Sequence, residues 1–85
     1  MKYKVVAETV RGTGKSDRTV LTMETNRTDA IGEFVRNRVH RFRDREHGEP
    51  FSRVVLVEME GVVVNFPEEG WDDACEEWLR KNDWF

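Results

Sequence analysis

Apolar and polar residues alternate along two segments near the start of the chain, residues 3–10 and 18–25. Both segments are rich in β-branched side chains, and alternation with a period of two is typical of strands that bury one face. The stretch 12–17, with two glycines, lies between them. The pattern therefore predicts a β-hairpin with a long tip.

The spacing of the apolar residues changes after residue 26. They then recur every three or four positions, at Ala30, Ile31, Phe34, Val35, Val39 and Phe42. This spacing is typical of an amphipathic helix, and we expect one over residues 29–45 with Thr28 as its N-cap. Gly48 and Pro50 should end it, because proline lacks an amide donor and glycine tolerates a left-handed turn.

The same order of elements returns in the second half of the chain. Residues 52–60 and 62–66 read as strands, and Gly61 between them predicts a tight hairpin turn. A second helix begins near residue 70 and is marked by Trp71, Ala74, Cys75, Trp78, Leu79 and Phe85. We expect Trp71 and Trp78, two turns apart, to pack on the sheet.

Two strand–strand–helix units (ββαββα) predict an α+β fold. We expect a two-layer sandwich in which a four-stranded, largely antiparallel sheet carries both helices on one face. A chain of 85 residues has room for one hydrophobic core, so residues 1–85 should form a single domain. The chain has neither a signal-peptide run nor an apolar stretch of membrane-spanning length, so we expect a cytoplasmic protein with no membrane partner.

Charge divides along the sequence. Residues 1–57 carry 12 basic and 8 acidic side chains, and residues 58–85 carry 2 and 9, which together give a net charge of −3. On the first helix a basic stripe is predicted opposite the apolar face, consisting of Arg36, His40, Arg43 and His47. On the second helix a solvated acidic face is predicted, with Glu69, Asp72, Asp73, Glu76 and Glu77. Both are candidate partner-binding surfaces.

The basic stripe suits carboxylates or phosphates. An acidic protein surface is the favoured partner, because the chain is acidic overall and no aromatic residue is interleaved with the stripe as in nucleic-acid sites. Arg38 instead projects near the centre of the apolar face. It should reach an edge of that face or pair with a carboxylate.

The strands pose a conflict, because both of their faces carry valines. If the helices cover Val5, Ala7, Leu21, Met23, Val55 and Val57, alternation leaves an open sheet face with Val6, Val20, Val54 and Leu56. Such valines can be tolerated, because antiparallel sheets often keep one face in water. A contiguous exposed apolar patch instead marks an interface, and we favour an interface with another protein or with a second copy of the chain. Strand addition at an open edge is an alternative.

The candidate catalytic and cofactor-binding motifs of this chain lack the residue spacing that such motifs require. The stretch 12–16 ends as a phosphate loop does, but it lacks the earlier glycine, and a strand follows it. His40 and His47 lie seven residues apart without a third ligand, so we predict no metal site. Cys75 reads as a buried hydrophobe. We therefore predict no cofactor and no catalytic residues.

The residues at the chain end leave two alternatives open. Trp84 and Phe85 either pack on the body of the domain or anchor a partner. Packing is favoured.

The favoured hypothesis is a small non-enzymatic module that occludes or bridges a partner protein. Stand-alone domains of this size are common in phages and mobile elements, and an inhibitor of a host defence system is one such role. The alternative is a nucleic-acid-binding accessory protein that uses the Arg-rich first helix. An enzyme with a site across an oligomer interface has the least support, since no nucleophile with its base is evident.

Overall fold

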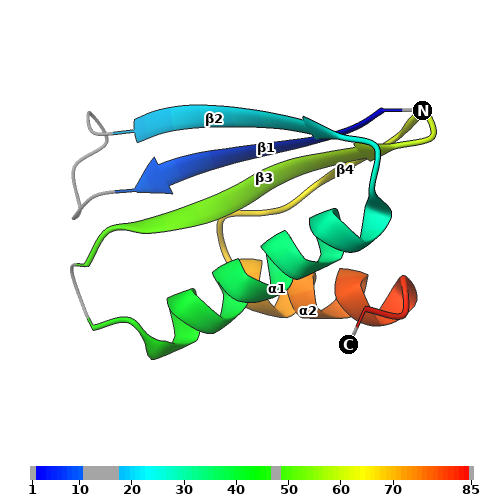
Figure 1. The fold of residues 1–85 in the computed structure, drawn as a ribbon. Helices are drawn as coiled ribbons and strands as arrows, with labels where there is room; N and C mark the ends of the chain where they lie inside the picture. The colour runs from blue at the N-terminus through cyan, green and yellow to red at the C-terminus, as the bar shows by residue number, and fades with distance from the viewer. Residues whose placement is uncertain (1, 11–17, 47–48, 85) are drawn as a thin grey trace.

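The computed structural model describes residues 2–10, 18–46 and 49–84. Its secondary structure follows the order strand, strand, helix, repeated once (Figure 1). The elements are β1 (Tyr3–Val10), β2 (Arg18–Thr25), α1 (Thr28–Asp44), β3 (Phe51–Met59), β4 (Val62–Asn65) and α2 (Trp71–Lys81). The predicted ββαββα order and the α+β class are confirmed.

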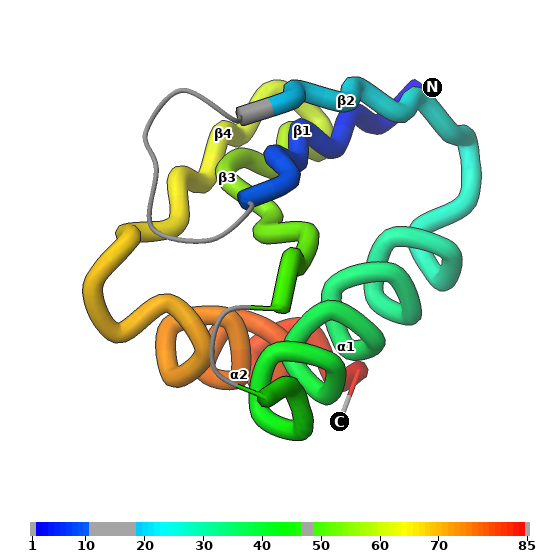
Figure 2. Tube along the Cα trace, turned by 90° about the vertical axis from the view of Figure 1, so that its left-hand side faces the viewer, coloured from blue at the N-terminus to red at the C-terminus, as the bar shows by residue number. Residues whose placement is uncertain are grey.

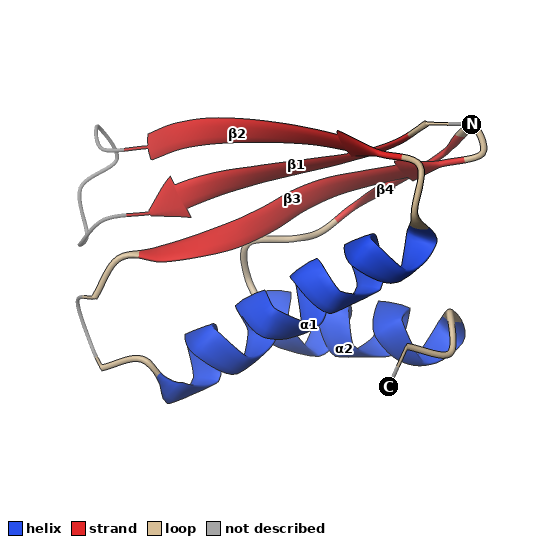
Figure 3. Ribbon diagram, viewed as in Figure 1, coloured by secondary structure: helices blue, strands red, loops and turns tan. Residues whose placement is uncertain are grey.

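The four strands form one antiparallel sheet in the order β2-β1-β3-β4, so β2 and β4 are its edges. Both helices lie on one face of this sheet, as predicted (Figures 2 and 3). α1 starts close to β2 and runs obliquely beneath the sheet, away from the strands (Figure 1). Within the described ranges, no helix is long and apolar enough to cross a lipid bilayer.

The turn between β3 and β4 contains only Glu60 and Gly61. Both residues have positive φ, 53° and 80°, as type I′ hairpin turns require. Glycine adopts this conformation without strain because it has no Cβ atom. The tight hairpin predicted at Gly61 is therefore confirmed.

The start of α1 differs from the prediction by one residue. Thr28 is the first helical residue, and the N-cap is Arg27, which has extended backbone and makes no side-chain capping bond. The Arg27 amide donates instead to Oγ1 of Thr25 at 3.1 Å. Its guanidinium binds Asp29 in the first turn at 2.6 Å. Thr28 as N-cap was therefore wrong, because a local arginine–aspartate pair organises this helix end.

The core lies between the sheet and the two helices. Its most buried members are Val5, Ile31, Val35, Val39, Val54, Val57, Phe66, Trp71, Cys75 and Leu79. Two aromatic contacts extend it, an edge-to-face pair of Phe42 and Trp71 at 5.5 Å and another of Phe66 and Trp78 at 5.6 Å. Each large apolar side chain buried in this way contributes about 1.5–3 kcal/mol to stability.

An irregularity in β3 overturns the predicted position of Val54. The pairing of β1 with β3 shifts between Val6 and Ala7, which leaves Val55 without a partner in β1. An extra residue of this kind interrupts strict alternation. Val54 therefore lies in the core with 0% exposure instead of on the open sheet face.

The carboxyl-terminal tail folds back onto the helices. Asp83 has a φ of 59°, and the amide of Trp84 then donates to the carbonyl of Leu79 at 2.9 Å. The Trp84 ring packs against Trp78 with centroids 5.0 Å apart. Trp84 thus packs on the body of the domain, as favoured from the sequence, and Phe85 lies outside the described residues.

Gly32 makes this docking of the tail possible. It is buried within α1, and a Cβ atom built there would lie 2.5 Å from Cδ2 of Trp84. A glycine inside a helix costs about 0.5–1 kcal/mol relative to alanine. The close approach of an indole ring explains why a glycine stands at this position.

Candidate functional site

Arg43 of α1 is bound by three carboxylates of α2. Its Nε donates to Asp72 at 3.2 Å, and its Nη2 donates to Asp73 at 3.4 Å and to Glu76 at 2.8 Å. Glu76 also accepts a bond from Arg80 at 3.0 Å. The side chains of Arg43 and Glu76 are 37% and 23% exposed. These charged groups therefore join the two helices at the boundary with solvent.

The same contacts shift the titration of both partners. Hydrogen bonding by Arg43 lowers the pKa of the Glu76 carboxyl, and hydrogen bonds to Glu76 and Asp72 raise the pKa of Arg43. Each shift favours the charged form. The solvated acidic face predicted for α2 is therefore wrong for Asp72 and Glu76, because Arg43 of α1 lies against these two carboxylates.

The rest of the predicted basic stripe does not form one free cationic surface. Nη1 of Arg36 donates to the carbonyl oxygen of Trp84 at 3.2 Å and so holds the tail. His40 is exposed on α1, and His47 lies outside the described residues. Arg36 and Arg43 thus stabilise the domain itself.

The rest of the predicted acidic face stays at the surface. Glu69 is exposed, and Glu77 is exposed with Lys81 as an ion-pair partner at 3.5 Å. The Asp73 side chain is 85% exposed despite its contact with Arg43. The exposed acidic face therefore contains fewer than the five predicted carboxylates.

Glu8 and Arg53 form a buried ion pair that the sequence reasoning missed. Nε and Nη2 of Arg53 donate to Oε1 of Glu8 at 3.1 and 2.7 Å, and both side chains are about 10% exposed. Nη1 of Arg53 donates to the carbonyls of Phe66 and Pro67. This pair ties the segment after β4 to the sheet. Only the strand register, which pairs Glu8 with Arg53, reveals it.

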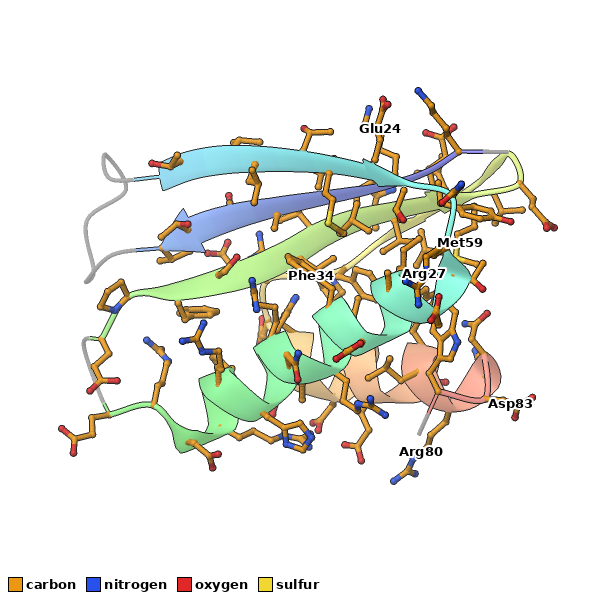
Figure 4. The ribbon with its side chains drawn as sticks, in the orientation of Figure 1. Glu24, Arg27, Phe34, Met59, Arg80 and Asp83 are labelled. Atoms are coloured by element: carbon orange, nitrogen blue, oxygen red, sulfur yellow. The ribbon has the colours of Figure 1, made fainter. Side chains whose placement is uncertain are left out.

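The open sheet face does not carry one continuous apolar patch. The register places a charged row across β2, β1 and β3, consisting of Glu24, Lys4 and Glu58. Val6 and Leu56 lie in the next row and are half-buried. Glu24 points away from the helices on this face (Figure 4). Of the four sheet residues predicted as an interface, only Val20 is largely exposed, at 65%.

The exposed large apolar side chains of the described residues lie on the two edge strands. They are Val20 and Leu21 on β2, and Val62 and Val63 on β4, with 65, 55, 63 and 48% exposure. Leu21 was predicted to face the helices. Its partner Ala7 is buried, but β2 is the edge strand and few residues of α1 reach it.

An apolar groove runs between β4 and α2. Two adjoining hollows of about 380 and 290 Å³ share Val64 and Trp78 as walls. The first is also lined by Val57, Met59, Glu60, Val62 and Asn82, and the second by Asn65, Phe66, Pro67, Ala74, Glu77 and Lys81. Grooves of this apolar character are typical of binding sites on protein surfaces.

The outer backbone edge of β4 lies beside this groove. The amide of Phe66 donates to the carbonyl of Val55 at 3.0 Å, and Val64 pairs with Val57 in the same ladder. Because pairing groups alternate along an antiparallel strand, the amide and carbonyl groups of Val63 and Asn65 point outward. They are available to another strand.

The described residues contain no metal-binding cluster of three or more His, Cys, Asp or Glu side chains. Cys75 has 0% exposure, and burial raises the pKa of its thiol to about 12. A thiol in this environment is a poor nucleophile. Its predicted role as a buried small side chain agrees with its place in the core.

Comparisons with known proteins add no functional information. No known protein family, no curated protein and no solved structure matches this chain.

Proposed function

We propose that this chain is a small non-enzymatic module that binds an extended segment of a partner protein along β4. Binding there would occlude or bridge the partner. The observation that carries the proposal is the combination of an open strand edge, two exposed valines and an adjoining apolar groove.

The open edge of β4 and the adjoining apolar groove complement each other in strand addition. The outward amide and carbonyl groups of Val63 and Asn65 would pair with the added backbone, which supplies affinity. Every second side chain of the added strand would point toward the helix side, next to Val62 and Val64 in the groove. The expected ligand therefore alternates apolar and polar residues.

Charge around β4 indicates a basic partner. Glu60 and Glu77 line the hollows, and Glu58 lies directly opposite Val63 in the register. Lys81 lines the second hollow but is paired with Glu77. A second copy of the chain would bring the same carboxylates against these, so a foreign segment with Lys or Arg beside its apolar residues fits better than a homodimer.

The test is selection of peptides from a random display library on the wild-type protein and on Val63→Pro. Proline at position 63 removes an outward amide and leaves the β3 ladder intact, as edge strands tolerate. Wild type should enrich peptides with alternating apolar residues and basic flanks. Val63→Pro should bind those peptides at least about tenfold more weakly.

Two results would contradict the proposal. One is equal binding of the selected peptides by wild type and by a folded Val63→Pro variant. The other is a dimer in solution that Val63→Pro dissociates, which would assign β4 to self-association. Inhibition of a host defence protein by a phage or mobile element remains our hypothesis for the biological role.

A further inference from the structure

A second set of arginines lies on the side of α1 that faces the sheet. Arg38, Arg41 and Arg45 follow Phe34 at spacings of four, three and four residues, so they share one stripe of the helix. Phe34 lies between α1 and the sheet (Figure 4). This stripe differs from the one predicted from the sequence, which contains Arg36 and Arg43.

Arg38 has an unused hydrogen-bond donor. Its guanidinium lies over the Phe34 ring, 4.2 Å from the centroid. Its Nε is buried and has no hydrogen-bond partner among the described residues. Within the described residues, Arg38 therefore neither pairs with a carboxylate nor finds an acceptor for its Nε, although a buried donor without an acceptor is costly. A bound acceptor would remove this cost.

Arg41 borders a hollow between α1 and the sheet. The hollow has a volume of about 320 Å³ and is also lined by Thr9, Glu49, Pro50, Phe51 and Ser52. Thr9 and Ser52 are directly paired across β1 and β3. Directly paired residues in an antiparallel ladder point to the same side of the sheet. Thr9 and Ser52 therefore lie side by side in the wall of the hollow that Arg41 borders.

The arginines of this stripe differ from Arg27, Arg43 and Arg53 in their ion pairing. In the described part of the chain no carboxylate lies within ion-pair distance of Arg38 or Arg41, whereas Arg27 and Arg53 each bind one carboxylate and Arg43 binds three. Burial and the charge of Arg41 lower the pKa of Arg38. Arg45 is also without a carboxylate there; it stacks on Phe51 at 4.3 Å. Such a concentration of positive charge favours an anion.

We propose that Arg38, Arg41 and the hydroxyls of Thr9 and Ser52 bind the phosphoryl group of a small free molecule. Planar guanidinium groups donate two parallel hydrogen bonds to phosphate oxygens, and hydroxyls add further donors. A nucleic acid fits less well, because the net charge is −3 and Glu49 borders the hollow. This site is separate from β4, so it stands without the proposed function.

The test is an NMR titration of backbone amides with sodium phosphate and with sodium pyrophosphate, against sodium chloride at equal ionic strength. The amides of Thr9, Arg41 and Ser52 should shift and saturate with phosphate or pyrophosphate only. Arg38→Gln and Arg41→Gln should each weaken binding at least about tenfold, whereas Arg80→Gln, an equal change of charge on α2, should change it less than about twofold.

Glu49→Gln supplies a test by gain of affinity. Removal of its negative charge should tighten phosphate binding, which a loss of folding cannot imitate. Shifts that match those in sodium chloride, or an Arg80→Gln effect equal to that of Arg41→Gln, would overturn the proposal. A short single-stranded oligonucleotide that binds through Arg38 and Arg41 where phosphate and pyrophosphate do not would replace it with a nucleic-acid site.

Discussion

The two sides of α1 use arginine in opposite ways. On the side toward α2, Arg43 binds three carboxylates, Arg36 holds the tail, and Gly32 receives the Trp84 ring. On the side toward the strands, the Nε of Arg38 has no hydrogen-bond partner in the part of the chain that the structure describes, and Arg41 borders a hollow. One side is closed by contacts within the chain, and the other is open.

The difference shows that charge counted along a sequence is a poor guide to binding surfaces. The polarised charge of the two halves is partly neutralised where α1 meets α2. Among the described residues, Arg38 and Arg41 have no carboxylate partner, and Arg38 is the arginine that the apolar periodicity placed on the packing face. Substitution of an arginine on the side toward α2 should therefore affect stability differently from substitution of an arginine on the side toward the strands.

The largest expected effect is on the alkylation rate of Cys75, which lies in the core between the helices and the sheet. Because burial raises the pKa of Cys75 from 9.0 to about 12, its thiolate population near neutral pH falls about 10³-fold. Alkylation by iodoacetamide should therefore be slower than that of an unfolded control by at least this factor. Rapid alkylation of the folded protein would show that the layer between helices and sheet is open.

Gly32→Val should have the next largest effect. The added side chain would overlap the Trp84 ring, so we expect a loss of about 2–3 kcal/mol in urea unfolding. Trp84→Ala removes the overlap. In that background Gly32→Ala should stabilise the protein by about 0.5–1 kcal/mol, the ordinary helix preference. Destabilisation by Gly32→Ala with Trp84 absent would contradict the proposed role of the glycine.

Arg43→Met should destabilise the protein less than Gly32→Val, and in a pH-dependent way. The folded-state pKa of Glu76 is lowered, so its contribution is present above its ordinary pKa of 4.5 and is lost as pH falls through the lowered value. The difference in unfolding free energy between wild type and Arg43→Met should therefore shrink at acidic pH. A difference that is independent of pH would argue against the ion pair.

Arg38→Met should have the smallest effect, and of opposite sign. Methionine keeps the contact with Phe34 and removes a buried donor that has no acceptor among the described residues, so stability should stay equal or rise by about 0.5 kcal/mol. The matched change Arg43→Met provides the comparison in the same helix. A clear loss of stability in Arg38→Met would mean that Arg38 is a structural residue.

Most of the fold followed from local patterns. Period-two alternation predicted the strands, three-to-four spacing predicted α1, and glycine predicted the turn at Gly61. Two failures have local causes. A side-chain pair of Arg27 and Asp29 replaced the expected cap, and the extra residue in β3 moved Val54 into the core.

The candidate sites were harder to predict because they depend on register and docking. Glu8 and Arg53 lie far apart in the sequence and meet only through the pairing of β1 with β3. The position of Arg43 depends on how α1 packs on α2, which no single-helix projection contains. The groove beside β4 likewise requires the strand order, which the sequence left undetermined.

The most direct test of the contrast between the two sides of α1 is an NMR spectrum of the arginine Nε–Hε groups, recorded with and without sodium phosphate. Without phosphate, the Hε of Arg43 should exchange slowly with water because it is bonded to Asp72. Phosphate should shift the signals of Arg38 and Arg41 and leave Arg43 unchanged. A shift of Arg43 with Arg38 and Arg41 unaffected would contradict the assignment of a closed and an open side.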